Sequence, residues 1–371
     1  MADLATGGDG DAALQVLTER TLWLQITDWM AGWPYCVYAF ERCTRDVRGA
    51  RDGGLAQLAI AADDRRMLSK LHALRKFPSY LAHPKLQFTG VVRCAARHGR
   101  LETLKWLCEV MPQDPDWEWE QDVLQAAINN NNQGDIEILD WIVENCPPQS
   151  AYLRPDDASS AAGRGEAEKV RWLHEHGYQF TSSAINQAAK QGYLEIVQYL
   201  HEHCAEGCTT KAMDAAAGSG HLQIVQFLHA NRAEGCTKAA MDCAASAGDL
   251  RIVTFLHENR SEGCSTSAMD LAAANGHLEV VQFLHQHRLE GCTSEAIDNA
   301  AKMGHLDVVR FLHENRREGC SMLAMHYAAV NGHLAVVEYL HEHRSEGCTS
   351  FTIDMVEANG HLDVVQFLQQ N

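Results

Sequence analysis

Glycine recurs at a fixed interval through the second half of this chain of 371 residues. Two interleaved series each repeat every 28 residues. The first series is Gly192, Gly220, Gly248, Gly276, Gly304, Gly332 and Gly360, and the second is Gly207, Gly235, Gly263, Gly291, Gly319 and Gly347. Two glycines per unit predict two turns per unit, and a fixed period of this length is typical of a solenoid of stacked repeats. The period therefore argues against two or three ordinary globular domains, which the length alone would allow.

Each unit carries two short helical patterns, which are clearest in residues 291–318. Alanine and isoleucine recur at intervals of three to four residues after Thr293, whose hydroxyl group suits an N-cap. A second apolar stripe includes Leu306, Val309 and Leu312. One such pair cannot bury its own apolar faces, whereas small alanines let the helices of adjacent units approach closely. We therefore expect an all-α solenoid of stacked helix-turn-helix units with one continuous core.

The conserved pattern within the units resembles the ankyrin repeat. Residues 268–284 read Ala-Met-Asp-Leu-Ala-Ala-Ala-Asn-Gly-His-Leu-Glu-Val-Val-Gln-Phe-Leu, and the ankyrin pattern is Pro-Leu-His-x-Ala-Ala followed by Gly-His-x-x-(Val/Ile)-Val-x-x-Leu-Leu. The chain departs from the family in its period of 28 rather than 33 and in Ala-Met-Asp at the place of Pro-Leu-His. Eight residues between Leu284 and Thr293 are too few for the usual β-hairpin. The resemblance implies ankyrin-like units whose hairpins are shortened or absent.

The repeats become less regular toward the N-terminus. Gly99, Gly134 and Gly165 each precede a further second helix, which gives ten units, and residues 59–74 are a weaker eleventh. We expect irregular ankyrin-like repeats over residues 55–180 and regular ones over residues 181–371.

The residues before the repeats do not share their pattern. We expect residues 1–11 to be disordered and residues 12–54, which are too apolar for a free tail, to form a helical cap on the stack. The alternative is that residues 12–48 dock a second protein, for instance ubiquitin ligase machinery.

Histidine and cysteine are numerous, with 20 and 13 residues, but they recur once per unit. Such recurrence predicts that the histidines cap and hydrogen-bond within each turn rather than catalyse a reaction. The segment 201–208 lacks the paired cysteine spacing of a zinc site.

Stacked helices lie about 8–10 Å apart, so we expect cysteines such as Cys264 and Cys292 to be buried thiols rather than disulfide partners. No hydrolase, phosphate-loop, metalloprotease or dinucleotide motif occurs, which predicts no enzymatic activity, no cofactor and no metal.

Two positions of the first helix differ from copy to copy, and they are four residues apart, hence on one face. Counted from the N-cap, the third residues are Ser183, Lys211, Ala239, Ser267, Glu295, Leu323 and Phe351, and the seventh are Gln187, Ala215, Cys243, Leu271, Asn299, Tyr327 and Met355. We call these two columns the first-helix face. Residues that the stacking leaves free to vary are available for recognition, and the resemblance implies that this face is the concave surface. The candidate contacts are Glu295, Asn299, Leu323, Tyr327, Phe351 and Met355, with Lys211 and Lys302 as weaker candidates.

The last repeat offers another interpretation of the apolar candidates. They could instead shield the end of the stack. Thr352 and Glu357 replace alanines there, which suits a repeat with no neighbour.

Charge and hydropathy limit the partners. A net charge of −18 argues against nucleic-acid binding, which needs a basic surface. No apolar run reaches the roughly 18–20 residues of a membrane span, and the first residues lack the features of a signal peptide. We therefore expect a monomeric protein-binding scaffold of the cytoplasm or nucleus that has no membrane contact.

Overall fold

The computed structural model describes residues 54–76, 86–113, 119–130, 136–205, 207–345, 347 and 349–370. These residues form 22 α-helices and a short 3₁₀-helix, η2 (Met111–Gln113), and none of them lies in a strand. The disordered tail expected at residues 1–11 and the cap or docking segment expected at residues 12–48 lie outside the described residues.

The chain divides into two compact units, residues 1–153 and residues 154–371. The described part of the first unit holds three helix pairs. These are α4 (Leu55–Ala61) with α5 (Arg65–Arg75), α7 (Val91–Arg97) with α8 (Leu101–Val110), and α9 (Val123–Ile128) with α10 (Ile136–Asn145).

The second unit holds eight further helix pairs. The first helices are α11 (Pro155–Arg164), α13 (Ser182–Gln191), α15 (Thr210–Gly218), α17 (Lys238–Ser246), α19 (Thr266–Ala274), α21 (Glu295–Lys302), α23 (Met322–Val330) and α25 (Ser350–Ala358). The second helices are α12 (Ala167–Glu175), α14 (Leu194–His203), α16 (Leu222–Asn231), α18 (Leu250–Asn259), α20 (Leu278–His287), α22 (Leu306–Asn315), α24 (Leu334–His343) and α26 (Leu362–Gln370). The all-α solenoid of 10–11 helix-turn-helix units is thus confirmed, and no β-hairpin joins the described repeats.

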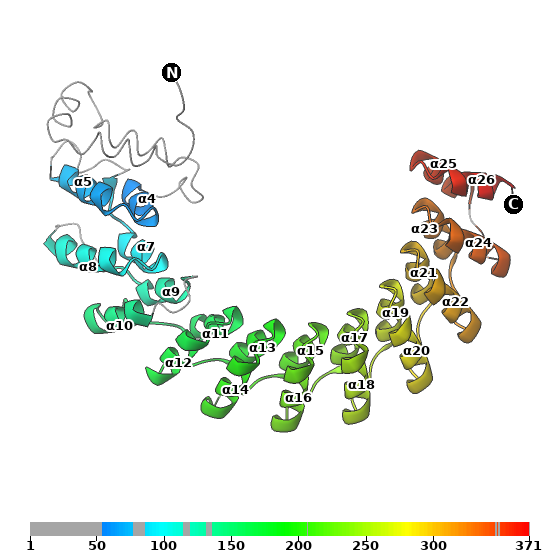
Figure 1. Cartoon of the computed structure of the whole chain (residues 1–371), viewed down its shortest axis with the longest axis horizontal. Coiled ribbons are helices and arrows are strands. Elements are labelled where there is room, and N and C mark those ends of the chain that lie inside the picture. Colours follow the sequence, from blue (N-terminus) through cyan, green and yellow to red (C-terminus); the bar gives the residue numbers. More distant parts are fainter. Residues whose placement is uncertain are drawn as a thin grey trace, which may run out of the picture. The chain divides into compact units, whose positions relative to one another are not determined.

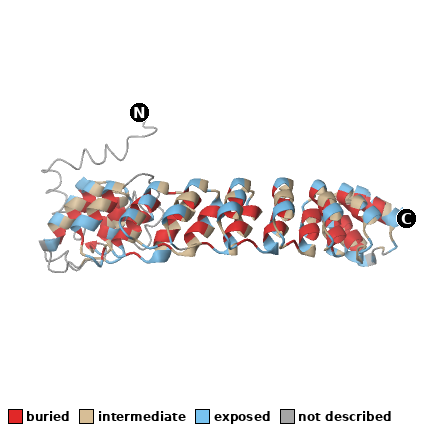
Figure 2. Cartoon of the chain, turned by 90° about the horizontal axis from the view of Figure 1, so that it is seen from below, coloured by how far each residue is buried: buried red, intermediate tan, exposed pale blue. Residues whose placement is uncertain are grey.

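The first helices stack more closely than the second helices. In α21, Ala300 and Ala301 are fully buried, and the same two alanines recur in the other regular repeats except the last, which has Val356 and Glu357 instead. Within residues 154–371, successive first helices contact one another more extensively than successive second helices do. Within residues 154–371 the first helices consequently line the inner side of a curve and the second helices its outer side (Figure 1). Buried residues recur in every helix pair along the array, as a continuous core requires (Figure 2).

The last repeat differs from the interpretation that its sequence suggested. Thr352 is buried, and its Oγ1 atom lies 2.9 Å from Nδ1 of His326 in the preceding repeat. The prediction that Thr352 marks an end without a neighbour was wrong, because the residue contacts the repeat before it. Glu357, by contrast, is exposed.

Candidate functional site

The N-terminus of each regular first helix is fixed by the helix before it. Oδ1 of Asp270 in α19 accepts a hydrogen bond from the Thr293 N–H at 2.8 Å, and Oδ2 accepts from the Thr293 hydroxyl at 3.0 Å. The Thr293 hydroxyl oxygen in turn accepts from the Glu295 N–H at 3.2 Å, although the N-cap residue of α21 is Ser294 and not Thr293 as predicted. The same bonds join Asp214 to Thr237, Asp242 to Ser265, and Asp298 to Ser321. These bonds set the register of the first helices.

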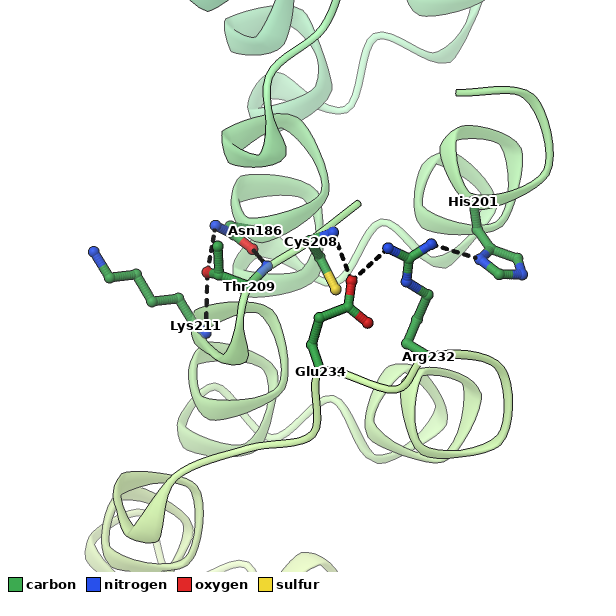
Figure 3. A network of polar contacts seen from close by, with 7 residues as sticks. All are labelled: Asn186, His201, Cys208, Thr209, Lys211, Arg232 and Glu234. Atoms are coloured by element: carbon green, nitrogen blue, oxygen red, sulfur yellow. Dashed lines mark hydrogen bonds and ion pairs between the residues drawn. The ribbon is translucent and has the colours of Figure 1, made fainter. Parts of the chain in front are cut away.

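A second set of polar contacts joins the loops between repeats, and Figure 3 shows one copy of it. Arg232 forms an ion pair with Glu234, and its Nη1 atom lies 3.4 Å from Nδ1 of His201. Glu234 also accepts a hydrogen bond from the backbone N–H of Cys208 in the preceding loop at 3.3 Å. We call this arrangement the Arg–Glu–Cys cluster. It recurs as Arg260, Glu262 and Cys236, and as Arg288, Glu290 and Cys264.

The clusters hold their carboxylates in the charged form. In the later copies two guanidinium nitrogens face two carboxylate oxygens, and Nε of Arg288 lies 3.2 Å from Oε2 of Glu290. The hydrogen bond from the guanidinium lowers the pKa of Glu290 to about 2. Burial acts in the opposite direction at Asp270 and raises the pKa of that carboxyl group.

Both glycine series are needed because side chains from the next repeat cover them. Gly276 has φ +76°, and a Cβ atom there would lie 2.7 Å from the ring of His305. Gly263 has φ +74°, and a Cβ atom there would clash with Nη2 of Arg288. Only glycine combines this backbone conformation with the close contact. The 28-residue glycine period therefore results from contacts between consecutive repeats.

The two histidine columns have structural roles, but the predicted bonds within one turn were wrong. His333 Nε2 lies 3.0 Å from the backbone oxygen of Lys302, 31 residues earlier, and His221 contacts Lys190 in the same way at 3.2 Å. The other column meets aromatic rings edge-on: His257 lies 5.5 Å, centroid to centroid, from Phe283 of the next repeat. Both columns therefore connect neighbouring repeats.

The first-helix face is open to solvent. Phe351 is 64% exposed and Leu323 is 43% exposed, and both occupy the third position counted from the N-cap residue. Lys211 and Glu295 at the same position are exposed, whereas Asn299, Tyr327 and Met355 at the seventh are half-buried. In Figure 3 the Lys211 side chain extends away from the contacts between repeats.

One of the weaker candidates is in contact with a stronger one. The ammonium group of Lys302 in α21 lies 5.2 Å from the ring centroid of Tyr327 in α23, and Lys302 is itself exposed. This distance suits a cation–π contact, which orients the tyrosine ring on the face. Lys302 and Tyr327, from two neighbouring first helices, thus lie in contact on the first-helix face.

The described residues contain no group of three or more His, Cys, Asp or Glu side chains arranged to hold a metal ion. Cys208, Cys236, Cys264 and Cys292 are buried free thiols, as predicted, whereas Cys320 of the same column is only partly buried. Burial raises the pKa of Cys264 and of Cys292 to about 11. None of the helices in the described ranges is long and apolar enough to cross a membrane.

Known families cover most of the second unit. A family model of ankyrin repeats in many copies matches residues 241–285 and 297–341, and a model of three ankyrin repeats matches residues 158–242. Residues 158–341 thus consist of ankyrin repeats. No curated protein matches the chain. Ankyrin repeats are generally protein–protein interaction modules.

In these ankyrin repeats, sequence reasoning missed two apolar residues beside the face. Met303 is 57% exposed and Met322 is 53% exposed. Each stands in a column that is polar or small in the other regular copies, and this local departure was the available signal. Met322 precedes Leu323 at the start of α23, whereas Met303 directly follows the end of α21.

Proposed function

We propose that this ankyrin array is a non-enzymatic scaffold that binds a protein partner along its first-helix face. The observation that carries the proposal is the exposure of large apolar side chains, Leu323 and Phe351, at positions that the stacking leaves free. Exposed apolar and aromatic residues on a rigid support are typical anchors of protein interfaces. The contacts between repeats hold these side chains in fixed order, so that little conformational entropy is lost on binding.

The contacts that we propose follow three successive first helices. Leu323, Tyr327, Phe351 and Met355 supply the apolar part of the surface, and Glu295 and Asn299 supply polar contacts at its edge. Lys302 adds a cation beside Tyr327. Lys211 lies three repeats before α21 and would meet only a partner that extends along the array.

The test is affinity capture of partners from native lysate, read by mass spectrometry. The intact chain is compared with a Leu323→Ala, Phe351→Ala double variant. A Leu289→Ala variant is the matched control, because Leu289 is fully exposed in a loop between repeats. We expect a partner that the intact chain and the control retain and that the double variant loses. Circular dichroism and melting curves must show that all three proteins are equally folded.

Identical partner lists for all three proteins would contradict the proposal. A partner lost instead on deletion of residues 12–48, with unchanged melting, would support the alternative adaptor function. We also propose that the protein is monomeric, lies in the cytoplasm or nucleus and does not bind nucleic acid. The free thiols favour this compartment, and the negative net charge disfavours nucleic-acid binding. Sedimentation analysis of the purified chain tests the monomeric state directly.

A further inference from the structure

Two thiol groups from consecutive repeats are in contact within residues 1–153. Cys108 lies in the last turn of α8, and Cys146 directly follows α10, where its N–H donates to the Ile142 carbonyl oxygen at 2.9 Å. The two side chains are hydrogen-bonded to each other. Both cysteines are free; Cys146 is only 9% exposed, whereas Cys108 is partly exposed.

The repeat register explains this contact independently. Cys108 lies nine residues after the glycine that precedes its helix, which is the position of His201 in the regular repeats. Cys146 lies twelve residues after the corresponding glycine of the next repeat, which is the position of Arg232. His201 and Arg232 are themselves in contact, with Nδ1 and Nη1 3.4 Å apart. The architecture therefore brings these two positions together, and in this irregular pair of repeats both positions are cysteine.

The same register shows what this interface lacks. In the regular repeats the arginine is followed two residues later by the glutamate of the Arg–Glu–Cys cluster, as Arg232 is by Glu234. At that position after Cys146 stands Pro148, which has neither a carboxylate nor an N–H group. The interface between these two repeats thus has a thiol pair where the interfaces that contain Arg232, Arg260, Arg288 and Arg316 have an ion pair.

We propose that Cys108 and Cys146 are a redox modification site, at which a hydroperoxide converts the two thiols into a reversible disulfide that joins consecutive repeats. The hydrogen bond that Cys108 donates lowers the pKa of Cys146, and the thiolate is the reactive form of cysteine. The buried sulfur is therefore the first nucleophile and the more exposed thiol resolves the intermediate.

The reaction is balanced with hydrogen peroxide as the oxidant. The Cys146 thiolate attacks one peroxide oxygen, the O–O bond breaks, and the departing hydroxide takes up a proton to leave as water. The product is a sulfenic acid. The Cys108 sulfur then attacks the sulfenic sulfur, the S–O bond breaks, and the released hydroxide takes the Cys108 proton to form a second water. Two thiols and one peroxide yield one disulfide and two waters, and a dithiol reductant reverses the change.

The sequence makes the test direct. Trypsin cleaves after Lys105 and next after Arg164, because the Arg154–Pro155 bond resists the protease, so residues 106–164 form one peptide whose only cysteines are Cys108 and Cys146. The full chain is treated with hydrogen peroxide, its remaining thiols are blocked with N-ethylmaleimide, and the digest is analysed by mass spectrometry. We expect this peptide to lose the mass of two hydrogens and to carry no maleimide. After dithiothreitol treatment it should carry two.

The peptide 239–251 is an internal control, because it contains the exposed Cys243 and no second cysteine. It should keep its maleimide at the peroxide dose that closes the disulfide. In separate Cys108→Ser and Cys146→Ser variants, the remaining thiol should stay available to maleimide or stop at the sulfenic acid. The oxidised wild type should melt at a higher temperature than the reduced protein, and the serine variants should show no such shift.

Several results would overturn the proposal. One is a peptide 106–164 that carries two maleimides after peroxide treatment while the peptide 239–251 is already oxidised. Another is a disulfide that links either cysteine to a different part of the chain. Overoxidation of both sulfurs without a disulfide would also contradict it. These measurements use the wild-type chain, so they hold even if a serine variant fails to fold.

Discussion

Neighbouring repeats in residues 181–371 are joined by polar contacts that recur from one interface to the next. The bonds from Asp270 to Thr293 have counterparts at the interfaces before and after them. The ion pair of Arg288 with Glu290 likewise recurs with the same geometry in adjacent loops. The same set of side chains therefore joins one repeat to the next at successive interfaces.

The described part of residues 54–153 joins its repeats by contacts that each occur once. Both carboxylate oxygens of Glu120 accept backbone hydrogen bonds, from Val92 at 3.1 Å and from Arg93 at 2.9 Å. Arg100 forms an ion pair with Asp63 at 3.1 Å. Both regions nevertheless bury the same kind of apolar core. The comparison indicates that apolar stacking defines a repeat, whereas the polar contacts at an interface can be replaced.

The core should therefore respond alike in the two regions. Leu107 in α8 and Leu284 in α20 are both buried second-helix leucines. We expect Leu107→Ala and Leu284→Ala each to cost about 2–5 kcal/mol, through lost burial and the cavity left behind. Hydrogen exchange read by mass spectrometry would give the opening free energy of each repeat. A loss below about 1 kcal/mol at either site would break the equivalence of the two cores.

The glycine period should matter through the side chain that covers each glycine. Gly276→Ala must adopt a positive φ and also displace His305, whereas Gly360 has φ +82° with nothing within 4 Å of its Cβ position. We expect a cost of about 2–4 kcal/mol for Gly276→Ala and about 1–2 kcal/mol for Gly360→Ala. Chemical denaturation of the two variants measures the difference. Equal costs would mean that backbone conformation alone maintains the period.

The aspartates should matter only where another repeat follows. Asp270→Ala leaves the Thr293 N–H and hydroxyl without their acceptor, so we expect a loss of about 1–3 kcal/mol. Asp354 holds the same position in the last repeat and is exposed, so Asp354→Ala is the control and should change stability by less than about 0.5 kcal/mol. Hydrogen exchange at the N-terminus of α21 should rise in the first variant alone. Equal effects would show that the aspartate acts within its own helix.

The fold was predictable because every copy of the repeat reports the same structure. The 28-residue period and the alanine and valine spacing predicted the helices, their order and the absence of hairpins in the described repeats. The exposure of Leu323 and Phe351 also followed, since positions that vary between copies cannot be required for stacking. Met303 and Met322 were missed because each departs from its column only once.

The contacts between repeats were less predictable, because a periodic sequence does not say which repeat a side chain faces. Asp270 was noticed only as a departure from the ankyrin pattern, although its partner Thr293 lies 23 residues later in the next unit. One signal was available. His326 replaces the aspartate in the same interface where Thr352 replaces an alanine, and the structure joins these two residues. Two neighbouring copies that both depart from the repeat pattern can therefore indicate a contact between them, which a single copy cannot indicate.

Acid titration should produce the smallest of these effects and act only on the regular region. The guanidinium groups lower the pKa of Glu290 and of Glu318 to about 2, against an ordinary value of 4.5. A lowered folded-state pKa contributes stability that is complete above pH 4.5 and is lost as the pH falls toward 2. Each pair lies near the surface, so we expect at most about 1 kcal/mol from each.

The measurement is the stability difference between the wild type and a Glu290→Gln, Glu318→Gln variant, followed by denaturation from pH 7 to pH 2. The difference should be constant above pH 5 and shrink between pH 4.5 and 2, since the wild-type carboxylates then become as uncharged as glutamine. Glu279→Gln on the exposed side of α20 is the control, because it makes the same change of side chain outside the clusters. The variant comparison is necessary because Asp270, whose pKa burial raises, changes stability in the opposite sense. If the difference persisted undiminished at pH 2, the clusters would act by shape and hydrogen bonding rather than by charge. The thiol pair of the irregular repeats, which carries no ion pair, would then resemble the Arg–Glu–Cys clusters in how it joins two repeats.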